Sequence, residues 1–340
     1  MNVKWYLSDT HCCGHVRAEI IARDLNQNFP NVNVDCKTQF MLSDVPKTNV
    51  MVFQRQYTPA LRQRMLYAKS RGILTIYDLD DDLFNVPAEF SSASQFFSQP
   101  YVQAEMQLYM QQADLVTVST GDLAQAIRKY SNTPIFVIEN CLDVINWARP
   151  PRDPATVVIG WVASHVHKTG VPLVSGPLLK LLREFPQVRV QLIGCVGFAE
   201  APELKEFEGR VDCKPWVDIA ALPDVMSRFD IGLAPLWKHP FNDCKSNIKA
   251  LQYWANETAV VCSPRPPYSC VQDGVNGLYA DGEEQWYAQM KRLVENVALR
   301  KELGAKGRQT VVQKFDVRAG ARNWLYVFGN PKTGLTPVAR

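Results

Sequence analysis

The segment 229–236 reads Phe-Asp-Ile-Gly-Leu-Ala-Pro-Leu, an apolar run that ends in a proline turn. A helical pattern follows at 248–256, and a second apolar run, Ala-Val-Val-Cys-Ser, occupies 259–263. Short apolar runs bounded by turn residues are typical of buried strands, and a helix between two of them predicts a parallel strand–helix–strand unit. This stretch therefore predicts an α/β fold.

The same alternation extends in both directions along the chain. Repeated strand–helix alternation implies parallel sheets with helices on both faces, so we expect two Rossmann-like domains. Further strands are expected at 3–7, 32–34, 49–53, 73–77, 115–119, 135–138, 156–161 and 188–194, and further helices at 15–26, 59–70 and 173–185.

The division into domains rests on length and on one proline-rich segment. A chain of 340 residues exceeds the roughly 250–300 residues at which a single core stops growing. Three prolines within 150–154 mark a linker, after which the strand pattern restarts. We expect domains over 1–150 and 151–318 that face each other across a cleft. Ligands of open parallel sheets bind beyond the carboxyl ends of the strands, so the loops there are the place to look for chemistry.

Composition excludes several classes of protein. Hydrophobic residues make up 46% and charged residues 21%, which excludes a disordered chain or a coiled-coil rod. The net charge of +3 excludes a chain that holds polyanions by bulk charge alone. The nine cysteines include no Cys-x-x-Cys pair, so a structural zinc site has no support. Because we find no signal peptide and no apolar run of about 18 residues, we expect a reduced, cytoplasmic protein without a membrane span.

A set of motifs in both halves resembles a known family of enzymes. Their order and spacing are similar to those of the two-domain GT-B glycosyltransferases near glycosyltransferase family 4. The motifs are Tyr-Asp-Leu-Asp-Asp-Asp-Leu at 77–83, Gly160-Trp161 with Ser164, His165 and His167, the segment 229–236, Pro-Phe-Asn at 240–242, Lys-Ser-Asn-Ile-Lys-Ala-Leu-Gln-Tyr at 245–253, and Asp-Gly-Val-Asn-Gly-Leu at 273–278.

The resemblance implies a division of labour between the domains. The second domain would hold a nucleotide-sugar donor, for which UDP-glucose is favoured, and the first domain would hold the acceptor. The final helix, within 319–340, would join the first domain. The resemblance implies no tightly bound cofactor and no need for a divalent metal. It includes viral enzymes that modify DNA, so the cytoplasm can be that of a bacterium or of a phage-infected host.

Donor-binding residues are expected in two loops of the second domain. Lys245 and Lys249 are four residues apart, which would place both on one face at the start of a helix, where lysines stabilise a departing diphosphate. The alternative is a solvated basic helix end. Ser246 and Asn247 are candidate caps of that helix, and Ser164, His165, His167 and Lys168 follow the strand at 156–161. For this second loop the alternatives are a plain surface loop and a metal site, although no further ligands accompany the two histidines.

The expected mechanism follows from a departure from the family pattern. Two donor-site carboxylates of the family are replaced by Cys244 and by Gln252, whose amide can still bond a ribose hydroxyl. The retaining mechanism usual in the family is therefore in doubt. We expect inversion instead, with Asp78, the first carboxylate after its strand, as the general base, and Asp80 as the next candidate near the acceptor. A metal site or helix capping and solvated charge are the alternatives for this carboxylate cluster.

The first strand-to-helix turn supplies further candidates. In the family this loop approaches the donor phosphates and the acceptor, which makes His11 a candidate catalytic residue and His15 and Arg17 candidate acceptor-binding residues. The alternative is an ordinary turn with a helix cap.

Two features of the first domain bear on the acceptor. The segment 55–71 contains five basic residues and no acidic one, namely Arg55, Arg62, Arg64, Lys69 and Arg71. Such a patch can position a DNA duplex, or it is a solvated helix face. The segment 90–112 is rich in serine, glutamine and aromatic residues and is expected to be a loop that stacks on bases or on sugars, or an ordinary long loop.

Together these features favour transfer to 5-hydroxymethylcytosine, or a related hydroxymethylpyrimidine, in DNA. A retaining enzyme that acts on a cell-surface polysaccharide or lipid-linked glycan is the alternative. A non-catalytic module that binds nucleotide sugars is the alternative from a different class. The oligomeric state is left open.

Overall fold

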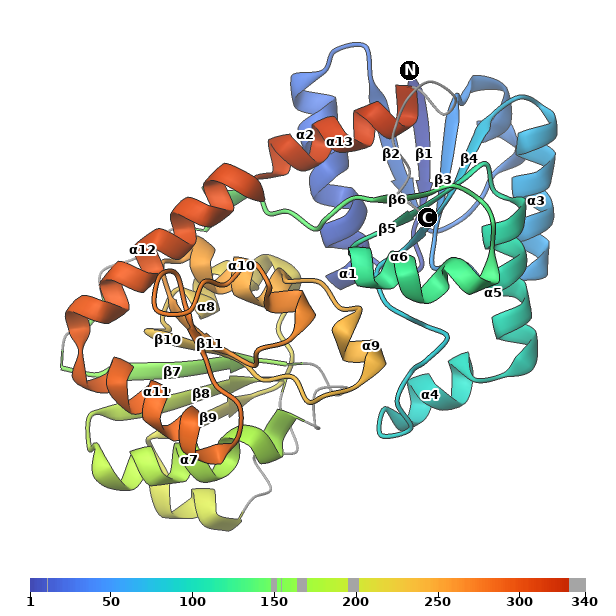
Figure 1. Ribbon diagram of the computed structural model, residues 1–340. Coiled ribbons are helices and arrows are strands. Elements are labelled where there is room, and N and C mark those ends of the chain that lie inside the picture. The colour runs from blue at the N-terminus through green and yellow to red at the C-terminus, as the bar shows by residue number, and fades with distance from the viewer. Residues whose placement is uncertain (11, 148–151, 154, 164–169, 195–201, 330–340) are drawn as a thin grey trace. The chain divides into compact units, whose positions relative to one another are not determined.

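The computed structural model describes residues 1–10, 12–147, 152–153, 155–163, 170–194 and 202–329, and it divides into two compact units (Figure 1). Unit 1 contains Met1–Cys141, Asp243–Ser246 and residues 315–329. Unit 2 contains Leu142–Asn242 and Asn247–Lys314. The units therefore part after Cys141 rather than at 150, and a short segment from the middle of the expected donor motif belongs to unit 1.

Unit 1 is built on a six-stranded sheet in which every pair of neighbouring strands is parallel. The order of the strands is β2-β1-β3-β4-β5-β6. The carboxyl ends of all six strands consequently lie along one edge of the sheet. The strands are β1 (Asn2–Tyr6), β2 (Asn33–Lys37), β3 (Val50–Gln54), β4 (Leu74–Leu79), β5 (Leu115–Val118) and β6 (Ile135–Val137).

Helices cover both faces of this sheet, because each central strand is apolar on both sides. In β3, Met51 and Phe53 enter one buried cluster and Val50 and Val52 enter the other. The helices are α1 (Cys12–Gly14), the π-helical turn His15–Glu19, α2 (Ile20–Asn28), α3 (Pro59–Ser70), α4 (Ser91–Phe97), α5 (Pro100–Gln112), α6 (Gly121–Ile127) and α13 (Val317–Gly329), with 3₁₀ turns at Leu42–Lys47 and Arg128–Tyr130.

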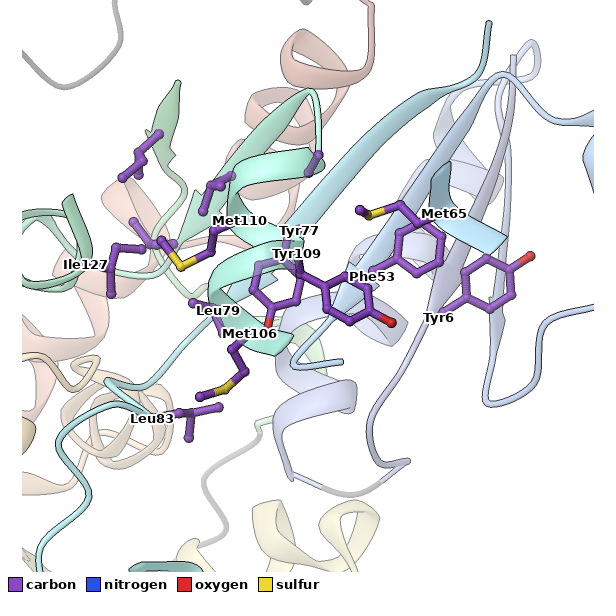
Figure 2. Close-up of a cluster of buried hydrophobic side chains, with 14 of the residues drawn as sticks. Tyr6, Phe53, Met65, Tyr77, Leu79, Leu83, Met106, Tyr109, Met110 and Ile127 are labelled. Carbon is purple, nitrogen blue, oxygen red and sulfur yellow. The ribbon is translucent and has the colours of Figure 1, made fainter. Parts of the chain in front are cut away.

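The segment 90–112 forms helices α4 and α5, so the expectation of a loop was wrong. Pro100 opens α5 at a position where a missing N–H costs no hydrogen bond. The buried residues of α5 recur at helical spacing and pack over the sheet, where Figure 2 shows Met106, Tyr109 and Met110 beside Tyr77. The rings of Tyr77 and Tyr109 stack with their centroids 5.2 Å apart. This packing fixes the helix, and the glutamines of the segment do not oppose it, because glutamine is a good helix former.

Helix α13 covers the opposite face of the unit 1 sheet beside α2 (Figure 1). Trp324 is buried against Trp5 of β1, with ring centroids 4.4 Å apart, and Phe328 adds a second edge-to-face contact. Burial of two tryptophans and a phenylalanine attaches the end of the described chain to unit 1.

Unit 2 repeats the plan with a second six-stranded parallel sheet, in the order β12-β11-β10-β7-β8-β9. Its strands are β7 (Val157–Val162), β8 (Val188–Ile193), β9 (Val211–Lys214), β10 (Ile231–Ala234), β11 (Ala259–Cys262) and β12 (Leu278–Tyr279). Its helices are α7 (Val171–Glu184), α8 (Leu222–Met226), α9 (Pro240–Asp243, whose last residue counts with unit 1), α10 (Ile248–Ala255), α11 (Glu283–Glu295) and α12 (Val297–Lys314), with 3₁₀ turns at Val144–Asn146, Pro202–Phe207, Ile219–Ala221 and Pro266–Tyr268. The expected α/β class with two parallel sheets is confirmed.

The glycine of the Gly160-Trp161 motif has a packing role in this sheet. A Cβ atom at Gly160 would lie 2.2 Å from the ring of Phe229, far inside van der Waals contact.

In the part of the chain that the structure describes, no helix is long and apolar enough to cross a membrane.

Candidate functional site

A buried ion pair lies where the central strands of unit 1 end. Asp78 is the fifth residue of β4 and is fully buried, and Arg17, in the π-helical turn, is 1% exposed. The guanidinium donates two hydrogen bonds, from Nη2 to Oδ1 at 2.7 Å and from Nε to Oδ2 at 3.2 Å. Thr117 Oγ1 donates a third hydrogen bond to Oδ1 at 2.7 Å. Both carboxylate oxygens of Asp78 are therefore engaged inside the protein.

This environment argues against Asp78 as the general base and against Arg17 as an acceptor-binding residue. A base needs an oxygen within hydrogen-bond reach of the acceptor hydroxyl, whereas Asp78 has no exposed surface. Asp78 also lies inside β4, not after it, which explains its burial. We reassign the pair as a buried structural anchor that holds the π-helical turn to the sheet.

The anchor continues to the segment Asp243–Ser246. Arg17 Nη1 donates to the carbonyl oxygen of Ile138 and to Oδ1 of Asn140 at 3.1 Å. Asn140 Nδ2 in turn donates to Ser246 Oγ at 2.8 Å. Thr120 Oγ1 donates to the carbonyl oxygen of Cys244 at 2.9 Å, and Cys244 is buried in the core of unit 1. These contacts explain why the segment counts with unit 1.

The expected geometry of the two lysines was wrong. Helix α10 begins at Ile248, so Lys245 precedes the helix and does not share a helical face with Lys249. Neither candidate cap acts as one: Asn247, at the N-cap position, makes no side-chain capping hydrogen bond, and Ser246 bonds Asn140 instead. The donor-binding roles of these four residues stay predictions.

A second charged cluster surrounds Arg55, directly after β3. Its guanidinium donates from Nε to Asp80 and from Nη2 to Asp81, and Lys245 Nζ lies 3.6 Å from Asp81 Oδ1. Burial raises the pKa of Asp80 although Arg55 opposes the shift, and burial likewise raises the pKa of the Cys13 thiol well above its usual value. At neutral pH Cys13 is therefore a thiol and not a nucleophilic thiolate.

Arg55 also has an unusual backbone. Its φ of 49° is in the left-handed region, which costs roughly 1–2 kcal/mol for a residue with a Cβ atom. The Arg55 amide donates to the carbonyl oxygen of Asp78 at 2.9 Å, and its side chain spans two carboxylates. These contacts offset the strain and fix the start of the loop that follows β3.

The basic patch expected at 55–71 is largely neutralised within unit 1. Arg62 is buried and donates from Nε to Glu105 at 2.7 Å, and Lys69 Nζ lies 3.1 Å from Asp114 Oδ1. Arg55 is held by its two aspartates. The exposed Arg64 donates to the carbonyl oxygen of Phe40 at 3.4 Å. Three of the five basic side chains therefore meet carboxylates from α5 and from the loops after β4 and α5. Arg64 and Arg71 remain exposed, so the patch that was expected to position a duplex is reduced to these two side chains.

Of the remaining candidates in the first turn of unit 1 and in the loop after β7, only His15 lies among the described residues. His15 Nδ1 lies 3.1 Å from Glu19 Oε2 within the π-helical turn, an irregularity that is frequent at functional sites. Five candidate residues lie outside the described part of the chain, so their roles stay predictions: His11, Ser164, His165, His167 and Lys168.

Unit 2 presents its candidates on α10. Gln252 is 4% exposed, and its Oε1 has no hydrogen-bond partner in the described part of the chain. One turn earlier, the half-buried Lys249 holds its ammonium 5.9 Å from the ring centroid of Trp216, which follows β9. A buried acceptor oxygen beside a lysine suits a ligand that carries both hydroxyl and phosphate groups.

The cluster in unit 1 includes residues that the sequence analysis missed. Asn140 and Thr120 each follow a predicted strand by two residues or fewer, and Thr117 lies within one. The rule that polar residues after parallel strands gather at one edge of the sheet was a usable signal for the first two. In the part of the chain that the structure describes, no group of three or more His, Cys, Asp or Glu residues is arranged to hold a metal ion; the independence from metal stays a prediction.

The Asn140–Ser246 hydrogen bond can be tested by a double-mutant cycle. We expect Asn140→Ala and Ser246→Ala each to lower the free energy of unfolding, with a coupling of about 0.5–1.5 kcal/mol, the usual net value of a hydrogen bond. Urea denaturation of the two single variants and the double variant gives this coupling. An additive cycle would show that Asn140 does not hold the segment Asp243–Ser246.

Comparison with known proteins places this architecture. Residues 176–326 match the family model described as glycosyl transferase-like. HepE from Anabaena, solved with UDP and glucose, aligns with a TM-score of 0.71 at 14% identity, over 97% of this chain and 99% of that chain. The chain has the GT-B fold. Sucrose-phosphate synthase from Thermosynechococcus elongatus aligns with a TM-score of 0.73 at 12% identity, over 96% and 98% of the two chains.

A glycosyltransferase from Rickettsia africae ESF-5 has the same GT-B arrangement, with a TM-score of 0.66 at 11% identity, over 98% of this chain and 99% of that chain. No curated protein sequence matches this chain significantly. The match to the glycosyl transferase-like family model thus covers residues 176–326, and the GT-B fold extends over nearly all of the chain.

Proposed function

We propose that the chain is a glycosyltransferase that moves a hexose from a nucleotide sugar, with UDP-glucose favoured, to a hydroxyl group of an acceptor. The observation that carries the proposal is the match of residues 176–326 to the glycosyl transferase-like family model, because this region includes Lys249 and Gln252. The choice of donor is supported by HepE, a GT-B structure solved in complex with UDP-glucose.

The residues of α10 supply the chemistry that such a donor requires. The unpartnered Oε1 of Gln252 accepts a hydrogen bond from a ribose hydroxyl, which satisfies a buried oxygen that otherwise costs free energy. The Lys249 ammonium, and that of Lys245, neutralise the charge that develops on the departing diphosphate. None of these roles requires a metal ion.

For the acceptor, a glycan is better supported than DNA. The case for a hydroxymethylpyrimidine in DNA depended on a basic patch that contacts phosphates. Three of its five basic side chains, Arg55, Arg62 and Lys69, are instead ion-paired with carboxylates of unit 1. A patch in which three of five cations are held by carboxylates attracts a DNA duplex less strongly than a patch of five unpaired cations, so we propose a carbohydrate hydroxyl as the acceptor.

The structure also weakens the support for an inverting transfer. The expected inversion depended on Asp78 as the base, and Asp78 is buried with both oxygens bonded. Inversion would need another base, whereas retention in this fold needs none of this kind. The anomeric configuration of the product, measured by proton NMR, decides between the two.

Gln252 provides the test of the donor site. We expect purified protein to release UDP from UDP-glucose, and Gln252→Leu to raise the KM for UDP-glucose about 3-fold to 10-fold, the effect of losing a neutral hydrogen bond of about 0.5–1.5 kcal/mol. Gln252→Glu keeps the acceptor oxygen and should stay near the parent value. Binding of UDP-glucose without any release of UDP would favour the non-catalytic module, and an unchanged KM in Gln252→Leu would remove Gln252 from the donor site.

A further inference from the structure

Three half-buried aromatic rings form a cluster at the carboxyl edge of the unit 1 sheet, which we name the aromatic cluster: Tyr57, Phe96 and Phe97. The ring centroids of Tyr57 and Phe96 are 4.9 Å apart and those of Phe96 and Phe97 are 5.1 Å apart, both edge to face. Phe97 completes the triangle at 6.3 Å from Tyr57. The rings pack against the core on one side and keep part of their surface in solvent.

The cluster lies beside the charged groups of the candidate site. Tyr57 follows Arg55 by two residues, in the loop whose start is fixed by the strained Arg55 backbone. Helix α4, which carries Phe96 and Phe97, is reached from the loop after β4, where Asp80 and Asp81 bind Arg55. Both arms of the cluster therefore originate at the carboxyl ends of neighbouring strands.

The surrounding residues are polar but uncharged. From 90 to 104 the chain has no acidic and no basic residue, and it contains four serines and three glutamines. Among the residues that the structure describes at the strand ends, the cations Arg55 and Lys245 contact the carboxylates Asp80 and Asp81, so these two positive charges are matched by two negative ones. These paired groups therefore give a polyanion such as DNA little reason to bind at the cluster.

We propose that the aromatic cluster is an acceptor subsite for a neutral carbohydrate chain, an inference that rests on the proposed glycosyltransferase function. The C–H faces of a pyranose ring are apolar and pack on aromatic rings, while its hydroxyl groups bond uncharged amides and hydroxyls. Partly exposed rings surrounded by serine and glutamine provide both kinds of contact. The ring of Phe96 is central, because it makes the two shorter contacts of the triangle, at 4.9 Å to Tyr57 and 5.1 Å to Phe97.

The test uses the full chain with neutral tetrasaccharides, namely maltotetraose, cellotetraose and chitotetraose. Saturation-transfer NMR and the acceleration of UDP release from UDP-glucose measure binding. We expect at least one of the three to bind, and Phe96→Ala to weaken its affinity about 3-fold to 10-fold, as expected for the loss of an aromatic contact. Phe96→Tyr keeps the ring and should restore the affinity.

The control is Tyr67→Ala, which removes an exposed ring of α3 elsewhere in unit 1 and should change neither binding nor the basal release of UDP. An affinity that is unchanged in Phe96→Ala overturns the subsite. So does binding of only a heparin oligosaccharide or a hydroxymethylcytosine duplex, or of none of the three tetrasaccharides. UDP release by the parent chain without acceptor reports separately on the proposed function, so the two failures are distinguishable.

Discussion

Asp78→Asn is expected to lower the free energy of unfolding by about 3–5 kcal/mol, the usual cost of removing one partner of a buried ion pair. The substitution leaves the Arg17 guanidinium charged and buried, with Asp78 0% and Arg17 1% exposed. Few domains have more than about 5–15 kcal/mol of stability, so the loss is a large fraction of the total. Chemical denaturation monitored by circular dichroism measures it.

This experiment also separates the anchor from a general base. A base that is replaced by asparagine loses about 100-fold to 10,000-fold in turnover while the fold stays intact. An anchor loses stability first. Asp35→Asn is the matched control, because Asp35 is in the same unit and pairs with Lys4 at 2.8 Å with 41% of its side chain exposed. Exposed pairs contribute about 0–1 kcal/mol.

Two outcomes would contradict the anchor. If Asp78→Asn unfolds at the same denaturant concentration as the control but has lost turnover, Asp78 is a catalytic group after all. If the double variant Arg17→Met, Asp78→Leu is no more stable than Asp78→Asn, the cost does not come from the unpaired charge. Replacing both partners by apolar side chains of similar size should instead recover much of the loss.

The strands were predictable because their signal is local. Runs such as 49–53 and 259–263 are apolar on both sides, and burial on both faces of a parallel sheet requires that pattern. Strand β9 was not predicted, because it lies at a sheet edge and alternates apolar with polar residues over only four positions. Helix α5 was not predicted, because its buried residues are spaced among glutamines.

The roles of the charged residues were less predictable, since they depend on partners far away in the sequence. Asp78 pairs with Arg17, which lies 61 positions away in the sequence, and no local sequence pattern predicts that contact. A shift of the strand end by two residues, from the expected Tyr77 to Leu79, also moves Asp78 from a loop into the buried sheet. Lys245 illustrates the same limit, because its partner Asp81 lies in a distant loop and the helix starts three residues later than the spacing argument required.

The lysines of the donor motif should have the largest effect on turnover. We expect Lys245→Ala and Lys249→Ala each to reduce kcat/KM for UDP release from UDP-glucose about 10-fold to 150-fold, because a charge-assisted hydrogen bond to phosphate contributes about 1.5–3 kcal/mol. The structure gives the two residues different surroundings. Lys245 lies beside Asp81 in unit 1. Lys249 lies on α10 of unit 2, near the ring of Trp216.

These surroundings predict different secondary effects. Lys249→Arg keeps a cation on α10 and should recover part of the rate, whereas Lys245→Ala also leaves Asp81 with one cation fewer and should be more sensitive to salt. The exposed Lys238, between β10 and α9, is the control, and Lys238→Ala should turn over like the parent chain. Initial rates of UDP release across UDP-glucose concentrations and at two salt concentrations decide the matter. If both alanine variants keep near-parental kcat/KM, neither lysine contacts the diphosphate, and the helix position of Gln252 alone would have to define the donor site.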